Sequence, residues 1–256
     1  MENYIRQLIV DYVNCYPVLR QTSSMWQEPL IAFAAADDEW FTNLKETISS
    51  THVLPTDLLA DAQTVITYFI PFSKDIATSN VEGRESSREW AVAYIQTNQL
   101  ILDLNLHVQD KLCQQGFDTS ILPATHNFDP KKLISDWSHR HVAFIAGLGT
   151  FGLNNMLITE KGCSGRLGSL VTNLKLQPGL RSNRQNCLYK HQGLCKKCVE
   201  RCVNGALTET SYDRHLCYDM CLHNAELFNT LGLADVCGKC LVNLPCSFIN
   251  PTRTGI

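Results

Sequence analysis

The stretch that decides the fold is CLYKHQGLCKKCVERCVNGALTE (187–209), which places four cysteines within sixteen positions. Five more follow, so residues 187–256 hold nine of the twelve cysteines of the chain. The N-terminal sequence MENYIRQLIVDYVNCYPVLR has neither the plan of a secretory signal nor a twin-arginine motif. We therefore expect a cytoplasmic protein. In that compartment clustered thiols bind metal more often than they form disulfides.

Two cysteine runs have related spacing, CKKC-x3-C (195–202) and CGKC-x5-C (237–246). In ferredoxins with two [4Fe–4S] clusters, the late cysteine of a run binds the other cluster. Each cluster then needs one ligand from farther upstream. The spacing predicts a first set of ligands, Cys187, Cys195, Cys198 and Cys246. It predicts a second set of ligands, Cys202, Cys217, Cys237 and Cys240.

Two alternatives stay open at this point. A structural zinc ion bound by the two C-x2-C pairs would use four thiolates, but it would leave four neighbouring cysteines without a role. Within the second set, Cys221 lies four residues after Cys217 in CYDMC and could replace it as the ligand.

Length, composition and charge limit the partners and the domain organisation that we expect. The chain has 256 residues, 45% of them apolar, and a formal net charge of −3. A chain with this charge has no overall excess of basic residues, so the charge does not indicate nucleic acid as a partner. No run of 18 apolar residues is present, so we expect no membrane span. Residues 187–256 have few continuous apolar runs that could build a core, so this segment should need an inorganic nucleus. We place a domain boundary near residue 180, giving domains 1–180 and 181–256.

The first domain has the pattern of an α/β (α+β) fold. Apolar residues at helical spacing predict a helix over 2–14, and a long helix is expected over 88–116, ended by Gly116. Short apolar runs predict buried strands over 29–36 and 64–72, and another strand over 117–124. A helix is expected over 135–147. Residues 155–176 are expected to form two strands around a turn that contains glycine. Helices alternating with strands favour a sheet covered by helices.

The segment AGLGTFGLNN (146–155) contains Gly147-x-Gly149-x-x-Gly152, which matches the dinucleotide-binding pattern. That pattern should follow a strand and open a helix, whereas here it follows an expected helix and opens into a strand. We interpret it as either a tight turn or a bare backbone surface against which a cofactor lies.

HVAFIAGLGTFGLNNMLIT (141–159) and GRLGSLVTNLKL (165–176), followed by the cysteine runs, resemble the epoxyqueuosine reductases and the reductive dehalogenases. The resemblance implies a nitroreductase-like, cobalamin-binding sheet domain followed by a ferredoxin-like module with two [4Fe–4S] clusters. It also implies a corrinoid beside Gly147, Gly149, Asn154 and the strand start from Arg166 to Gly168. Epoxyqueuosine reductases carry an acidic proton donor ahead of the arginine that matches Arg140, where this chain has Leu133.

The segment WSHRH (137–141) offers other candidates for chemistry. His139 or His141 could donate a proton, because the pKa of histidine lies near neutral pH, although a plain structural role is the alternative. The two lie two residues apart, so on a helix only one can face the cleft. Arg140 could bind a phosphate or carboxylate of cofactor or substrate. Cys163 lies in a turn flanked by glycines, near the proposed cofactor.

These features together predict an iron–sulfur oxidoreductase that passes electrons through two clusters to a bound corrinoid. The expected partners are an electron donor of the ferredoxin or flavodoxin type and a small-molecule or corrinoid substrate. The alternative is a non-catalytic, ferredoxin-type electron-transfer protein that docks a redox partner.

Overall fold

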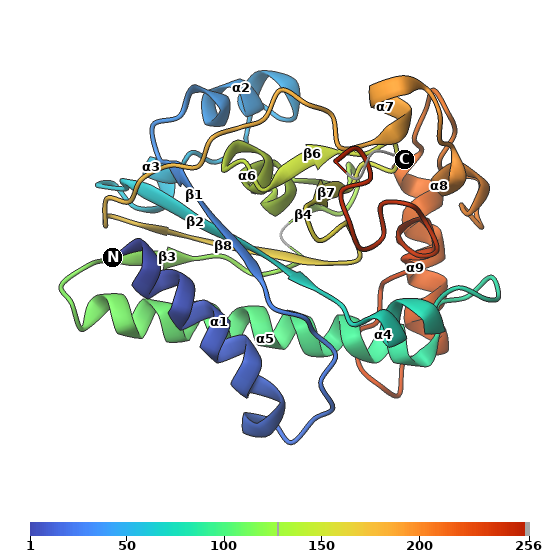
Figure 1. Cartoon of the computed structure of the whole chain (residues 1–256), viewed down its shortest axis with the longest axis horizontal. Helices are drawn as coiled ribbons and strands as arrows, with labels where there is room; N and C mark the ends of the chain where they lie inside the picture. The colour runs from blue at the N-terminus through green and yellow to red at the C-terminus, as the bar shows by residue number, and fades with distance from the viewer. Residues whose placement is uncertain (127, 254–256) are drawn as a thin grey trace.

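A computed structural model describes residues 1–126 and 128–253, and its centre is a four-stranded sheet (Figure 1). The strand order is β1 (Leu30–Ala35), β2 (Thr64–Pro71), β8 (Gly165–Thr172) and β3 (Thr119–Ile121), with every neighbouring pair antiparallel. All eight residues of β2 are buried, as its apolar run predicts. The strands expected over 29–36, 64–72 and 117–124 are therefore confirmed.

Helices cover both faces of this sheet (Figure 1). One face carries α1 (Glu2–Leu19) and α5 (Arg88–Cys113), and the other carries α2 (Glu39–Thr47), α3 (Pro55–Leu58) and α6 (His139–Ile145). Each face has its own apolar core. The short α4 (Lys74–Ser79) precedes α5. This arrangement confirms the α/β prediction.

The long helix begins and ends where its sequence indicates. The Ser87 hydroxyl accepts a hydrogen bond from the backbone N–H of Trp90 and caps the first turn of α5. Beyond its last turn, Gly116 adopts a φ of 83°, a conformation that glycine takes without steric cost. No described helix is both long enough and apolar enough to cross a membrane.

One local prediction was wrong. The helix expected over 135–147 begins only at His139, because residues 134–135 form β5 (Ile134–Ser135), which pairs with β4 (Phe128–Asp129). The two strands expected within 155–176 are present on either side of a turn at Gly162, but they do not pair with each other. Instead β7 (Leu157–Thr159) pairs with β6 (Gly149–Phe151), and β8 joins the central sheet.

The chain between β7 and β8 explains why these two strands do not pair. It turns at Gly162, and the backbone N–H groups of Cys163 and Ser164 then bond to carbonyls near the end of the chain, those of Cys246 and Ser247. A contact distant in sequence therefore separates the two strands.

The cysteine-rich segment lies at one end of the sheet (Figure 1). It contains α7 (Leu188–Gln192), α8 (Lys197–Glu200), α9 (Arg214–Leu227) and the 3₁₀ helix η1 (Lys239–Leu241). These elements are short apart from α9, so loops place most of the cysteines.

Candidate redox site

The first set of cysteines surrounds a small hollow. Cys187, Cys195, Cys198 and Cys246 all line a space of about 20 Å³, together with Asn154. Cys187 caps the start of α7, Cys198 lies within α8, and Cys246 arrives from the end of the chain. Burial and the neighbouring thiols raise the pKa of Cys198 to about 12. The fold thus brings together the four cysteines that the spacing assigns to one cluster.

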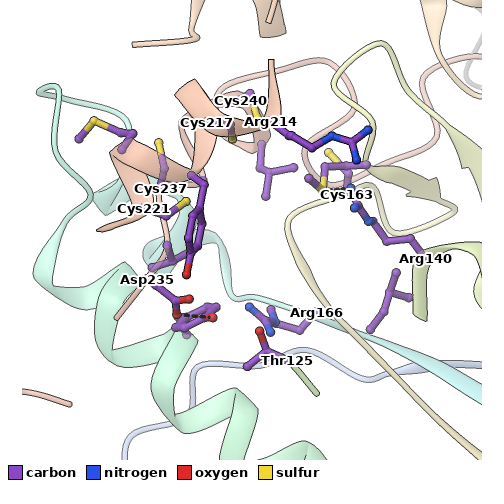
Figure 2. A pocket seen from close by; sticks show the side chains of 18 of the residues that line it. Thr125, Arg140, Cys163, Arg166, Arg214, Cys217, Cys221, Asp235, Cys237 and Cys240 are labelled. Atoms are coloured by element: carbon purple, nitrogen blue, oxygen red, sulfur yellow. Dashed lines mark hydrogen bonds between the residues drawn. The ribbon is translucent and has the colours of Figure 1, made fainter. Parts of the chain in front are cut away.

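The second set lines a much larger cavity, of about 450 Å³. Cys202 lies two residues after the end of α8, Cys217 lies in α9, Cys237 lies two residues before η1, and Cys240 lies within η1. Figure 2 shows Cys217, Cys237 and Cys240 near one another, with Cys221 beside Cys237. Cys202 also lines this cavity.

Both candidates for the α9 ligand face this cavity. Cys217 and Cys221 are one helical turn apart, so they share a face of α9. Hydrogen bonds from Cys221 and from the Tyr212 hydroxyl lower the pKa of Cys217, which favours its thiolate. Cys217 and Cys221 both stay candidates for the α9 ligand, because a metal deprotonates the thiol that it binds.

The donor chemistry fits iron–sulfur clusters. All twelve cysteines are free thiols; four of them line the small hollow and six line the large cavity, and a [4Fe–4S] cluster requires four. Among the described residues, no three His, Cys, Asp or Glu side chains are grouped around a single metal-ion position.

Arginines and aromatic rings form the other walls of the cavity. The Arg140 guanidinium donates to the Asn155 carbonyl at 2.8 Å, and burial lowers its pKa. Arg166 donates to the Asn98 side chain at 2.7 Å and lies over the ring of Tyr94, 4.3 Å from its centroid. Figure 2 shows Arg140 and Cys163 across the hollow from Cys221 and Cys237. Further lining rings are Phe69, Phe72, Trp90, Phe128, Trp137, Tyr212 and Tyr218.

Of the two candidate histidines, only His139 lines the cavity. Its Nε2 lies 2.9 Å from the Pro123 carbonyl and its Nδ1 lies 2.8 Å from the Ser169 hydroxyl. A carbonyl only accepts, so Nε2 carries the proton and Nδ1 accepts from Ser169. Burial lowers the pKa of His139 to about 4. Its neutral form is therefore held with both nitrogens occupied.

His141 lies away from the cavity. Its Nδ1 is 2.8 Å from the Ser138 hydroxyl, and its ring packs on Phe151 at a centroid distance of 4.9 Å. Burial lowers its pKa to about 4 as well.

The glycine segment forms a tight turn against the chain's own backbone. A Cβ at Gly147 would meet the Leu180 carbonyl group, and one at Gly149 would meet that of Ile158. At Gly168 it would meet the ring of Tyr68. None of these three glycines is among the residues that line the cavity.

Asn154 and Cys163 lie between the two groups of thiols. The Asn154 amide lines the first hollow and donates to the Cys240 carbonyl at 2.8 Å. The Cys163 thiol lines the large cavity and donates to the sulfur of Cys246 at 4.0 Å. These residues therefore connect the first set with the second.

Sequence reasoning missed one group in this cavity. The Asp235 carboxylate accepts from the Tyr94 hydroxyl at 2.8 Å and lies 2.9 Å from His126 Nε2. These three residues come from three distant segments, so no local pattern joins them. The only sequence signal is that Asp235 lies two residues before Cys237.

No protein-family model and no curated protein sequence matches the chain. Solved structures do match it. A selenomethionine-labelled epoxyqueuosine reductase is 16% identical with a TM-score of 0.58, over 96% of this chain and 66% of that one. The Bacillus subtilis epoxyqueuosine reductase, seen with its catalytic aspartate loop swung out of the active site, is 17% identical with a TM-score of 0.56, over 96% and 64%.

A third neighbour is an epoxyqueuosine reductase in complex with an epoxyqueuosine-modified tRNA-Tyr stem loop. It is 17% identical with a TM-score of 0.58, over 96% of this chain and 64% of that one. The chain therefore spans just under two thirds of the length of these neighbours. The fold of this protein resembles that of the epoxyqueuosine reductases, as its motifs predict.

Proposed function

We propose that the protein is an iron–sulfur oxidoreductase that delivers electrons from two [4Fe–4S] clusters to a corrinoid in the large cavity. The observation that carries this proposal is the wall of thiols: the second set of cysteines opens into a cavity whose other walls are cationic and aromatic. A cluster held there would border the bound molecule without intervening protein.

The two sets of cysteines have different tasks in this proposal. The first set holds a cluster in its own small hollow, separated from the large cavity by Asn154 and Cys163. The second set holds a cluster at the cavity wall. An electron therefore enters at the first cluster, from a donor of the ferredoxin or flavodoxin type, and reaches the cavity through the second.

The cavity suits a flat, partly apolar group. Its volume of about 450 Å³ includes the space that the second cluster would occupy, and it opens to solvent beside the exposed Arg214. Aromatic rings would pack against a macrocycle, while Arg140 and Arg166 would contact anionic or amide groups. A bound corrinoid would supply a metal that accepts electrons one at a time.

Proton supply should come from the chain. The Nε2–H of His139 donates a hydrogen bond to the Pro123 carbonyl, and burial keeps the ring neutral. His139 is therefore poorly placed to donate a proton to a substrate. Asp235 and its partners Tyr94 and His126 line the same cavity and are the better candidates.

The neighbour that binds a tRNA stem loop favours testing tRNA as the substrate. The net charge of −3 does not indicate such a partner, yet three arginines line the cavity against the single carboxylate of Asp235. We therefore propose a modified tRNA nucleoside as the first substrate to test, ahead of free small molecules.

Anaerobic purification tests the whole proposal. The protein should contain about eight iron and eight sulfide per chain, absorb broadly near 400 nm, and take up added cobalamin with a change in the corrinoid bands. Replacing Arg140 by Met should weaken this uptake while leaving the iron content unchanged. Iron without corrinoid uptake would support the electron-transfer alternative, and zinc in place of iron would refute both.

A further inference from the structure

One buried polar atom beside the second set of cysteines lacks a partner. The Trp90 side chain lines the large cavity and is 1% exposed. Its indole Nε1 has no hydrogen-bond partner among the described residues. A buried N–H without an acceptor costs about 1–3 kcal/mol, so an acceptor is expected in the space that it faces.

Trp90 packs directly on the loop between two of the predicted ligands. A Cβ at Gly238 would overlap Nε1 and the adjoining ring carbons of Trp90. Gly238 also has a φ of 72°, which glycine adopts readily. The glycine thus allows the indole N–H to approach the Cys237–Cys240 loop.

A buried cation lies in the same loop. Lys239 is 1% exposed, and its ammonium donates to the carbonyls of Asn80 at 3.0 Å and Glu82 at 2.6 Å. The Asn80 amide in turn donates to the Cys237 carbonyl at 2.9 Å. The connection between α4 and α5 therefore fixes both the loop and its positive charge.

We propose that the Trp90 indole donates a hydrogen bond to a sulfur of the second cluster, and that with Lys239 it raises the reduction potential of that cluster above that of the first. This inference rests on the proposed function. Reduction adds a negative charge to the cluster, and an N–H donor and a nearby ammonium both stabilise that charge. Electrons would then collect at the cluster that borders the cavity.

The test is a redox titration of anaerobic protein followed by EPR, comparing wild type with Trp90→Phe. The phenyl ring keeps the apolar contact and removes the N–H. We expect one midpoint potential to become more negative and the other to stay unchanged. A change of about tenfold in the ratio of reduced to oxidised cluster at a fixed potential corresponds to a shift of about 59 mV in the midpoint potential.

Trp26→Phe is the matched control, because its buried indole donates to Thr97 at 2.7 Å, within the apolar core. It should leave both potentials unchanged. Lys239→Met should shift the same midpoint as Trp90→Phe. Potentials in Trp90→Phe equal to those of wild type would overturn the inference, as would equal shifts in Trp90→Phe and Trp26→Phe.

A second measurement needs no substitution. Wild-type protein grown with ¹⁵N-indole tryptophan should show a weak ¹⁵N coupling to a reduced cluster in pulsed EPR, and its absence would overturn the inference even if Trp90→Phe fails to assemble clusters. Wild type that holds both clusters but lacks this coupling refutes only the role of Trp90. Wild type without iron refutes the proposed function and this inference with it.

Discussion

The stability of the protein should fall between pH 7 and pH 5 because of His139. This residue is 8% exposed and bonds to Pro123 and Ser169 through its two nitrogens. Ser169 also accepts from the Trp137 indole at 3.0 Å, so its hydroxyl proton is available to His139. Protonating His139 would place two donors face to face in a buried site.

The sign follows from the two pKa values of His139. Burial lowers its pKa to about 4 in the folded protein, from 6.5 in the unfolded chain. The unfolded chain therefore binds the proton first, so the stabilisation is present above pH 6.5 and is lost as the pH falls towards 4. The separation corresponds to about 3.4 kcal/mol in full, of which about 2 kcal/mol is lost by pH 5.

Urea unfolding under argon at the two pH values measures this loss. In His139→Gln the amide can still donate to Pro123 and accept from Ser169, but it does not titrate. The free energy of unfolding should therefore fall by about 2 kcal/mol less in the variant than in wild type. Other groups, His141 included, contribute equally to both proteins. A wild-type NMR resonance that is missing in His139→Gln and titrates near pH 6.5 would refute this reasoning.

Three further predictions concern the cysteine-rich segment. Cys198→Ala should lose about half of the iron and keep the EPR signal of one cluster, whereas Cys15→Ala, far from both sets, should lose none; complete retention in Cys198→Ala would contradict the assignment. Cys221→Ala should keep the full iron content, and loss of one cluster would make this residue the α9 ligand. Gly238→Ala should lower the free energy of unfolding by about 1–2 kcal/mol because of the left-handed backbone at this position. Overlap of the new Cβ with the Trp90 ring should lower it by about 1–3 kcal/mol more. Gly83→Ala, with similar φ and open space, should show only the first cost as a smaller drop in unfolding temperature.

The arrangement of the cysteines was accessible from the sequence because it follows local spacing. A C-x2-C pair fixes two thiols on one loop, and the crossed pattern then says which distant cysteine joins them. The two hollows separate the eight predicted cysteines into the same two groups. The central sheet was predictable for a similar reason, since β2 is mostly apolar and is buried throughout.

Sequence patterns could not predict the contacts made across long separations. Strand β7 pairs with β6 because the end of the chain occupies the turn after Gly162, more than 80 residues away by sequence number. Asp235 meets Tyr94 and His126 only in the folded chain, with separations of 141 and 109 residues. Periodicity carries no information about such pairs.

The glycine segment shows how one pattern can have two physical causes. Gly147 and Gly149 are needed because other backbone approaches closely, as the pattern indicates, but the approaching groups are the carbonyls of Leu180 and Ile158. A cofactor lying on bare backbone would demand the same residue type at both positions. Only the tertiary structure distinguishes the two causes.

The contacts around η1 connect the cysteine-rich segment to the sheet. The Cys237–Cys240 loop takes its shape from the connection between α4 and α5, since Asn80 bonds to the Cys237 carbonyl and Lys239 bonds back to Asn80 and Glu82. That same connection leads into the helix turn that carries Trp90. Residues before the cysteine-rich segment therefore supply the carbonyls that accept from Lys239 and the Trp90 indole that packs on Gly238. They shape a loop whose cysteines lie in the cysteine-rich segment. Under the proposed function, the residues that would position the second cluster belong to the part of the chain that builds the cavity, so the cluster site and the cavity wall would be specified together.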